Sequence, residues 1–215
     1  MKKMFDTADD RTGAEDPSAT LLKRELRKNA RRTRDAIDPA VRAAWSARIG
    51  ERVLQSPVLE KAEYILCYVS FGSEVMTDGI INHILENTDK KVYIPKIIRQ
   101  EMEFYRITSL QGLQASAWGI REPEEDPDKR FPRETFAGSP VGNPDDLLVL
   151  MPGIAFDRRR GRIGYGGGFY DRYLAVLGGC RTIALAYSAQ ILERVPVRSF
   201  DIRPERIFTE TEEIC

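Results

Sequence analysis

The residues with the clearest capacity for chemistry lie in one glycine-rich stretch, GRIGYGGGFYDRYL, residues 161–174. Its five glycines leave backbone N–H groups uncovered and allow positive φ angles, so phosphate oxygens can approach the backbone closely. Arg162 offers a planar cation before the glycines, and Asp171 offers a hard oxygen ligand after them. Tyr165 and Tyr170 add surfaces for stacking or hydrogen bonding. This pattern favours a loop that binds a phosphate-bearing ligand over a flexible turn between a strand and a helix.

Two established phosphate-binding motifs do not fit this stretch. The chain has no G-x-x-x-x-G-K-[ST] sequence, which argues against a P-loop NTPase. Gly164, Gly166 and Gly168 are similar to G-x-G-x-x-G, but the spacing differs and the unit comes late in the chain instead of after the first strand. A dinucleotide-binding fold is therefore poorly supported.

Short apolar segments alternate with amphipathic ones throughout the chain. Segments rich in β-branched and aromatic residues are predicted to be strands: residues 63–69, 91–95, 102–107, 147–152, 182–187 and 206–210. Helical spacing of apolar residues predicts helices over residues 22–37, 41–53, 77–87 and 169–177. This alternation indicates an α/β fold, with a single three-layer α/β/α domain and a mainly parallel sheet. In such sheets the ligand lies beyond the carboxyl ends of the strands, and the glycine stretch is expected to follow strand 147–152 directly.

Two segments do not fit the alternation. Residues 1–20 are polar and lack an apolar face, so we expect a flexible N-terminal tail and a folded domain over residues 21–215. Between Gly112 and Asp145, the sequence REPEEDPDKRFPRE combines three prolines with dense charge, which predicts a long surface loop.

Composition argues against several classes of protein. Thirty-three basic residues balance thirty-three acidic ones, so no global field attracts nucleic acid or an anionic membrane. No apolar run approaches the roughly 20 residues that span a bilayer, and MKKMFDTADD lacks the apolar centre of a secretory signal. Cys67, Cys180 and Cys215 have no metal-ligand spacing, and Cys67 is expected in the core. We expect a cytoplasmic protein that binds neither nucleic acid nor membrane.

In its full context the glycine stretch resembles the signature of a known family. Residues 151–174, MPGIAFDRRRGRIGYGGGFYDRYL, are similar to the signature of the 5-formyltetrahydrofolate cyclo-ligase family, also called methenyltetrahydrofolate synthetase. The resemblance extends from about Leu22 to Glu210. It includes four further motifs: the basic opening K-x-x-L-R, YVSFGSEVMT, AWGIREP and VPVRSFDIRPERIFTE. Four motifs in the right order are hard to obtain by chance.

The resemblance implies an α/β enzyme that converts 5-formyltetrahydrofolate and ATP into 5,10-methenyltetrahydrofolate, ADP and phosphate with Mg²⁺. A formamide oxygen is a poor leaving group, so the implied route transfers the γ-phosphoryl group to it and forms an imidate phosphate before N10 attacks. Such a protein mainly aligns its two ligands and neutralises the negative charge on the transferred phosphoryl group. Arg162 and Tyr170 are the implied catalytic residues, and a monomer or weak homodimer is expected.

The resemblance also implies the binding residues. The implied ATP site consists of Lys23, Arg24, Leu26, Arg27, Arg162, Ile163, Gly164, Tyr165, Gly166, Gly167, Gly168, Phe169 and Tyr170. The implied folate site consists of Val69, Glu74, Trp118, Tyr165, Gly166, Gly167, Gly168 and Phe169, with Phe71 as a further candidate. Asp171 and Asp201 are the implied Mg²⁺ ligands, which suits an ion that takes one or two carboxylates beside phosphates and waters.

Taken without the family pattern, these residues have simpler interpretations. Asp171 could be a charge at a helix N-terminus, Asp201 a loop cap and Glu74 a surface residue. Trp118 could instead anchor its loop. Seven cations lie between Lys23 and Arg34, and we expect three of them on a solvated helix face: Arg31, Arg32 and Arg34. The single histidine, His83, is interpreted as an ordinary helix residue.

Two positions depart from the commonest family pattern. Phe169 stands where tyrosine is often found. Gly167 stands where some members carry lysine, so binding of the phosphate charge falls to Arg162 and the backbone.

Two other classes of function stay open. One alternative is a non-catalytic nucleotide or folate binder on the same fold. The other is a nucleic-acid-binding protein that uses the basic helix 23–34, although balanced charge and the lack of a recognised motif count against it.

Overall fold

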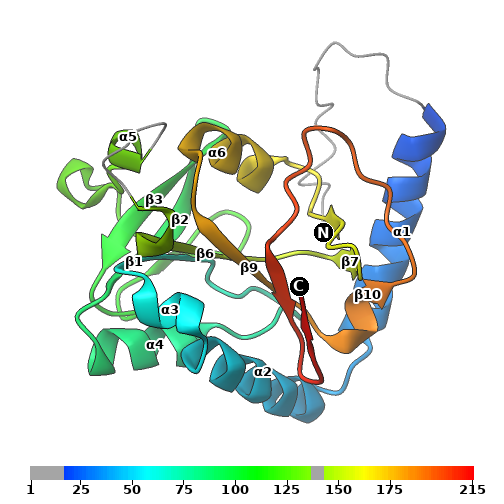
Figure 1. Cartoon of the computed structure of the whole chain (residues 1–215), viewed down its shortest axis with the longest axis horizontal. Coiled ribbons are helices and arrows are strands. Elements are labelled where there is room, and N and C mark those ends of the chain that lie inside the picture. Colours follow the sequence, from blue (N-terminus) through cyan, green and yellow to red (C-terminus); the bar gives the residue numbers. More distant parts are fainter. Residues whose placement is uncertain (1–16, 137–142) are drawn as a thin grey trace.

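A seven-stranded sheet forms the centre of the molecule (Figure 1). The computed structural model describes residues 17–136 and 143–215 of the chain. The strands run in the spatial order β12-β11-β9-β6-β1-β2-β3. Their bounds are β1 (Tyr64–Cys67), β2 (Lys91–Ile98), β3 (Glu101–Ile107), β6 (Leu147–Met151), β9 (Arg181–Leu185), β11 (Arg206–Phe208) and β12 (Glu213–Ile214). Each strand predicted from the sequence is present, and β12 adds an edge strand.

The sheet is mainly parallel, as the continuous apolar runs predicted. Strand β1 pairs in parallel with β2 and β6, β6 with β9, and β9 with β11. Only the edge strands β3 and β12 are antiparallel to their neighbours among the strands of this sheet. Every residue of β6 is buried, which is expected of a central strand covered on both faces.

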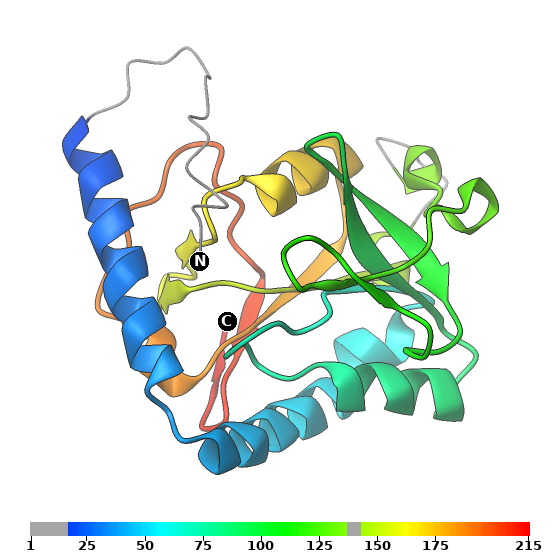
Figure 2. The same cartoon turned by 180° about the vertical axis from the view of Figure 1, so that it is seen from behind.

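Helices cover both faces of the sheet (Figures 1 and 2). One face carries α2 (Pro39–Leu54), α3 (Pro57–Lys61) and α4 (Asp78–Asn87), and the other carries α5 (Arg133–Phe136) and α6 (Phe169–Leu177). Successive residues of a strand point to opposite faces, so Ile65 and Cys67 pack with α2 to α4 while Leu66 packs with α6. The three-layer α/β/α prediction is confirmed.

Helix α1 (Pro17–Asp35) stands apart from the main sheet (Figure 1). It lies against a second, small sheet made of β7 (Ala155–Asp157), β8 (Arg162–Ile163) and β10 (Ile191–Leu192). Their apolar cluster consists of Ala30, Ile154, Ala155, Ile163 and Val195. The helix begins earlier than predicted, so residues 17–20 of the expected tail are helical, and residues 1–16 lie outside the described residues.

Two sequence-based expectations about connections were wrong. The glycine stretch does not follow β6 directly, because the β7–β8 hairpin comes between them. The segment after Gly112 is not simply a surface loop. It forms the hairpin of β4 (Gln114–Ala115) and β5 (Arg121–Glu122), the short helix α5 and two 3₁₀ turns, residues 127–129 and 144–146. It also buries the rings of Phe131 and Phe136 in the core. No described helix has the length and apolarity that crossing a membrane requires.

The β7–β8 hairpin can be tested through Gly161. A Cβ atom at this position would lie 2.5 Å from Val195 Cγ2 and 2.9 Å from Asp157 Oδ2, closer than real contacts allow. We expect Gly161→Ala to lower the free energy of unfolding by about 1–3 kcal/mol, the usual cost of overpacking, in urea denaturation. The matched control is Gly79→Ala in α4, where a Cβ atom would meet nothing within 4 Å. Equal stability of the two variants would contradict this account of the hairpin.

Candidate functional site

Segments that follow the strands of the main sheet meet at one edge of it. Residues 68–77 follow β1, Gly153 comes shortly after β6, and the glycine stretch leads from β8 into α6. Hydrogen bonds join them: the Tyr165 hydroxyl donates to Glu74, and a guanidinium from α1, that of Arg34, donates to the Gly153 carbonyl at 3.4 Å. The carboxyl edge of the sheet is therefore the candidate site, as the general rule for α/β sheets predicted.

The glycine loop ends in a helix N-terminus that no side chain caps. Gly168 is the N-cap residue of α6, it has a φ of +62°, and it offers no side-chain hydrogen bond to the first turn. Gly166 also has a positive φ, of +104°. The first N–H groups of a helix lack intrahelical partners and carry partial positive charge. The loop and α6 together suit an anionic ligand, although nine residues make α6 a short helix.

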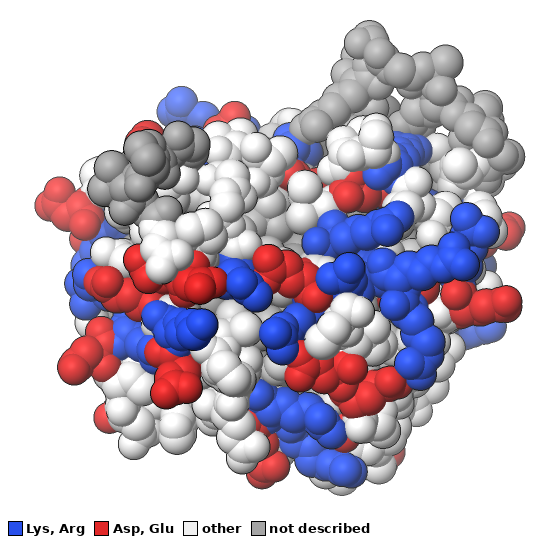
Figure 3. All heavy atoms as spheres, in the orientation of Figure 1, with Lys and Arg blue, Asp and Glu red and all other residues white. Residues whose placement is uncertain are grey.

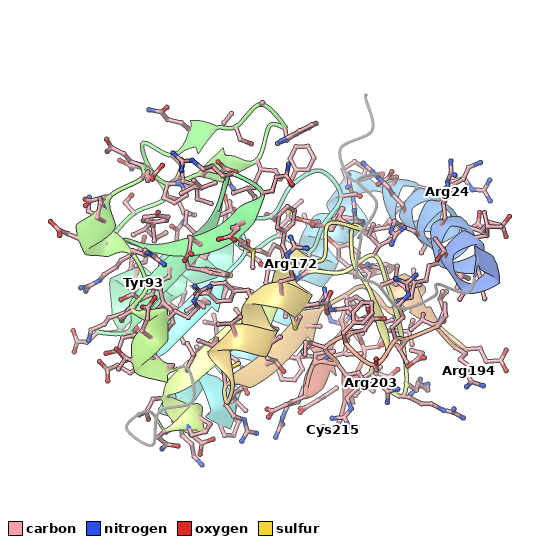
Figure 4. The ribbon with its side chains drawn as sticks, turned by 90° about the horizontal axis from the view of Figure 1, so that it is seen from above. Arg24, Tyr93, Arg172, Arg194, Arg203 and Cys215 are labelled. Carbon is pink, nitrogen blue, oxygen red and sulfur yellow. The ribbon has the colours of Figure 1, made fainter. Side chains whose placement is uncertain are left out.

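Arg172 fastens this loop from within α6. Its Nη1 donates to the Gly167 carbonyl at 2.7 Å, and its Cζ lies 5.1 Å from the centre of the Phe169 ring. Its Nη2 lies 3.4 Å from the carbonyl of Gln100 in the β2–β3 turn. Figure 4 shows Arg172 near the middle of the view, on the gold helix α6. Arg172 is not among the site residues predicted from the sequence, since an arginine inside an amphipathic helix normally faces solvent.

The two implied catalytic residues lie together. Arg162 is 6% exposed, and its Nη2 donates to Asp171 Oδ1 at 2.7 Å. Its Cζ lies 6.0 Å from the centre of the Tyr170 ring. Arg162 Nε and the Tyr170 hydroxyl are buried, and neither atom has a hydrogen-bond partner among the described residues. Burial raises the pKa of Tyr170 well above its usual value, so its phenol stays protonated and is a free donor.

The start of α1 reaches the glycine loop through two cations. Arg27 Nε donates to the Gly164 carbonyl at 2.8 Å, and Lys23 pairs with Asp201. Leu26 packs into the apolar cluster under α1. Arg24, by contrast, is exposed and lies on the outer part of the helix, far from Arg172 in Figure 4. Of the four implied ATP residues on α1, Lys23 and Arg27 are therefore at the site, while Leu26 holds the helix and Arg24 is not brought to it.

The two implied metal ligands lie close to each other in the fold. Asp171 Oδ1 accepts a hydrogen bond from the N–H of Ile202, the residue after Asp201, at 2.9 Å. Asp201 Oδ2 accepts from the Arg198 N–H at 2.7 Å. In each carboxylate the second oxygen has no hydrogen bond to any described residue, so hard oxygen donors of the kind that Mg²⁺ prefers are available. No group of three or more His, Cys, Asp and Glu side chains that could hold a metal occurs within residues 17–136 and 143–215.

Glu74 occupies the other end of the site. It is 8% exposed, which rules out the interpretation as a surface residue. Its Oε2 accepts from the Phe71 N–H at 2.8 Å, and its Oε1 accepts from the Tyr165 hydroxyl. Burial raises the pKa of Glu74, while the hydrogen bonds from Tyr165 and Phe71 and the charge of Arg34 oppose this shift.

Apolar residues near Glu74 differ in exposure. Val69 is buried, whereas Phe71 and Trp118 are 37% and 47% exposed. A Cβ atom on Gly119 would lie 3.2 Å from the Phe71 ring, so the loop that carries Trp118 lies against Phe71. The structure therefore brings Val69, Phe71 and the Trp118 loop to the end of the site that Glu74 occupies.

Arg34 corrects one expectation from the sequence. We expected it on a solvated helix face, but it is 2% exposed and donates to Ser73, Gly153 and Tyr165. Arg32 is exposed, as expected. A signal was present, because Arg34 lies one helical turn after the buried Ala30 on the stripe that starts at Leu26. His83 is exposed on α4 and Cys67 is fully buried, which agrees with the expectations for both.

Comparison with known proteins identifies the family of the chain. The model of the 5-formyltetrahydrofolate cyclo-ligase family matches residues 19–210. The chain belongs to this family. An Arabidopsis thaliana relative, "5-formyltetrahydrofolate cyclo-ligase, mitochondrial", is 34% identical over 87% of this chain and 73% of its own length. The Escherichia coli K12 cyclo-ligase is 26% identical over 85% of this chain and 97% of its own length.

Solved structures of cyclo-ligases share the fold. The NMR structure of Aquifex aeolicus 5,10-methenyltetrahydrofolate synthetase has a TM-score of 0.73 and 30% identity and covers 89% of this chain and 91% of that one. A synthetase from Mycoplasma pneumoniae has a TM-score of 0.66 at 21% identity, covering 87% and 98% of the two chains, and supports the fold alone. The sequence-based recognition of an enzyme family on an α/β fold is therefore confirmed.

The fastening of the glycine loop by Arg172 can be tested without substrate. We expect Arg172→Met to speed amide hydrogen exchange in the first turn of α6, where the residue 172 N–H donates to the Gly168 carbonyl at 2.9 Å, by about tenfold or more. A hydrogen bond that involves a charged group contributes about 1.5–3 kcal/mol, and its loss loosens the backbone that it holds. Arg158→Met is the control, since Arg158 is exposed and pairs with Glu212 elsewhere on the surface. Equal exchange in both variants would contradict the role of Arg172.

Proposed function

We propose that this cyclo-ligase family member converts 5-formyltetrahydrofolate into 5,10-methenyltetrahydrofolate, using ATP and Mg²⁺ and releasing ADP and phosphate. The observation that carries the proposal is the hydrogen bond from Tyr165 to Glu74. It joins the glycine loop, which suits phosphate, to the carboxylate that suits a pterin. A reaction between ATP and a folate requires the two ligands to meet at such a junction.

The proposed reaction has two steps. The formyl oxygen attacks the γ-phosphorus of ATP, the bond to the bridging oxygen breaks, and ADP leaves. N10 then attacks the formyl carbon and loses its proton, and the carbon–oxygen bond breaks as phosphate departs. Negative charge develops on the transferred phosphoryl group in the first step. The uncapped N–H groups of α6 and the buried Arg162 Nε are the donors of this chain best suited to stabilise it.

Charged groups around the loop have distinct proposed roles. Asp171 and Asp201 would hold Mg²⁺, which would supply positive charge against the phosphate oxygens of ATP. Lys23 and Arg162 pair with these two carboxylates and so lie where phosphate oxygens would also come. Arg27 orients the loop through the Gly164 carbonyl. The Tyr170 hydroxyl, buried and without a partner among the described residues, is a proposed donor to the transferring group.

The folate would bind at the other end of the site. Each oxygen of the Glu74 carboxylate accepts one hydrogen bond and keeps a lone pair for the amino and ring N–H groups of a pterin. The exposed rings of Phe71 and Trp118 offer apolar surface to the ligand. Phe169 has no hydroxyl to offer the ligand, and its ring lies 5.1 Å from Cζ of Arg172.

Nucleic-acid binding is less well supported. Basic and acidic side chains lie next to one another over much of the face in Figure 3. Several surface arginines are paired with carboxylates, among them Arg158 with Glu212 and Arg206 with Glu213. A cytoplasmic location and a monomeric or weakly dimeric state remain predictions, and the name of one relative includes "mitochondrial".

A direct assay tests the proposed activity. The purified protein is mixed with 5-formyltetrahydrofolate, ATP and Mg²⁺, and the near-ultraviolet absorbance of methenyltetrahydrofolate is followed. We expect product only when all three are present, with one ADP released per product because one phosphoryl group activates each formyl oxygen. Ligand binding in calorimetry without product would instead identify a non-catalytic binder.

Asp171→Asn tests the proposed metal role. The amide keeps an oxygen for Arg162 and the Ile202 N–H but loses the charge that holds a cation. We expect the Mg²⁺ concentration for half-maximal rate to rise by about tenfold to hundredfold, the range for weakened metal sites. Asp126→Asn, which changes an aspartate paired with Lys129 outside the site, should leave it unchanged. Identical Mg²⁺ dependence of Asp171→Asn and the unsubstituted protein would refute the assignment.

A further inference from the structure

We propose that Arg34 is a positioning residue for the Glu74 carboxylate and thereby sets the affinity for the folate. The proposal rests on the function proposed above. Arg34 makes no described hydrogen bond to the backbone of the glycine loop, residues 164–168, or to the proposed metal ligands. It acts on the site through two residues. Tyr165 donates a hydrogen bond to Glu74, and Ser73 directly precedes Glu74 in the sequence.

Arg34 connects three segments that build the site. Its Nε donates to Ser73 Oγ at 2.9 Å, in the loop after β1, and its Nη1 lies 3.4 Å from the Gly153 carbonyl after β6. Both Nη atoms lie 3.2 Å from the Tyr165 hydroxyl oxygen, in the glycine loop. A planar guanidinium with a fixed fork of N–H groups is suited to such a three-way contact, and lysine would satisfy only part of it.

The contact with Tyr165 fixes the direction of a hydrogen bond. A phenol has one O–H donor and accepts through its lone pairs. Because Arg34 can only donate, its N–H groups occupy the acceptor side of the Tyr165 oxygen. The single hydrogen of Tyr165 is therefore directed to Glu74 Oε1. With the Phe71 N–H on Oε2, this bond holds both oxygens of the carboxylate in one orientation.

Arg34 also supplies the charge that a buried carboxylate needs. An isolated ionised carboxylate is costly to bury unless a cation or several hydrogen bonds accompany it. The charged and titratable groups that act on Glu74 are Arg31 and Arg34 from α1, Tyr165 from the glycine loop, Tyr68 after β1 and Tyr170 from α6. Arg34 is the buried cation of this set, since the Arg31 side chain is 40% exposed.

The consequence is a link between Arg34 and the pH dependence of folate binding. A pterin donates N–H groups, so it requires the ionised form of Glu74. Loss of Arg34 raises the pKa of Glu74 further above its usual value, because the charge of Arg34 opposes the effect of burial. The KM for 5-formyltetrahydrofolate then starts to rise at a higher pH as the solution is acidified.

The test compares Arg34→Gln, Arg34→Lys and the control Arg32→Gln, whose residue is exposed on the same helix. KM for both substrates and kcat are measured as functions of pH. We expect Arg34→Gln to raise the KM for 5-formyltetrahydrofolate about tenfold or more at neutral pH, with a change of less than about threefold in the KM for ATP. In this variant the rise of the folate KM on acidification should begin at a higher pH than in the unsubstituted protein. Arg34→Lys should partly restore both the KM at neutral pH and its pH dependence.

A second variant keeps the proposal testable if Arg34→Gln does not fold. Tyr165→Phe removes the bond to Glu74 and leaves the ring, so we expect its acidic limb for the folate KM to move in the same direction. Equal increases in both KM values without a shift of the acidic limb would overturn the proposal and leave Arg34 a structural role. Activity of the unsubstituted protein is measured first, so a failure of the proposed function is seen separately from a failure of this inference.

Discussion

Burial of charge at the carboxyl edge of the sheet is the constraint on which the rest of the site depends. Two arginines, Arg34 and Arg162, are almost fully buried there. A buried guanidinium must find acceptors, so each one ties together segments that are distant in sequence. Arg162 connects β8 to α6 through Asp171, and Arg34 connects α1 to the loops after β1 and β6. The site is therefore held by its own charges as well as by the core beneath it.

The same constraint explains why α1 lies away from the main sheet. Its apolar stripe is narrow and packs on the small sheet of β7, β8 and β10 and on the loop residues beside it. The rest of its inward side carries Lys23, Arg27 and Arg34, which reach Asp201, the Gly164 carbonyl and the Glu74 loop. A helix with that pattern cannot cover an apolar sheet face, since cations there would lack partners. It forms a wall of the site instead.

Sequence patterns predicted the main sheet and the glycine loop because both depend on local features. A continuous apolar run such as 147–152 can only be a buried element, and five glycines next to Arg162 favour a loop that admits phosphate. The β7–β8 hairpin was missed because its strands are two or three residues long and carry no periodicity. The spacing after Ala30 pointed to the burial of Arg34, but its hydrogen-bond partners and the pairing of Arg162 with Asp171 depend on tertiary contacts, which composition and spacing do not encode.

The ion pair between Lys23 and Asp201 has a consequence for how the protein is made. The two residues are 178 positions apart, so the wall formed by α1 meets its last contact only when nearly the whole chain has left the ribosome. The five parallel strands of the main sheet are likewise complete only after β9 and β11 have been synthesised. Nascent chains that stop before residue 201 would carry the glycine loop and the first carboxylate but no closed site. The proposed site would therefore be completed only near the end of synthesis, when Asp201 becomes available to Lys23.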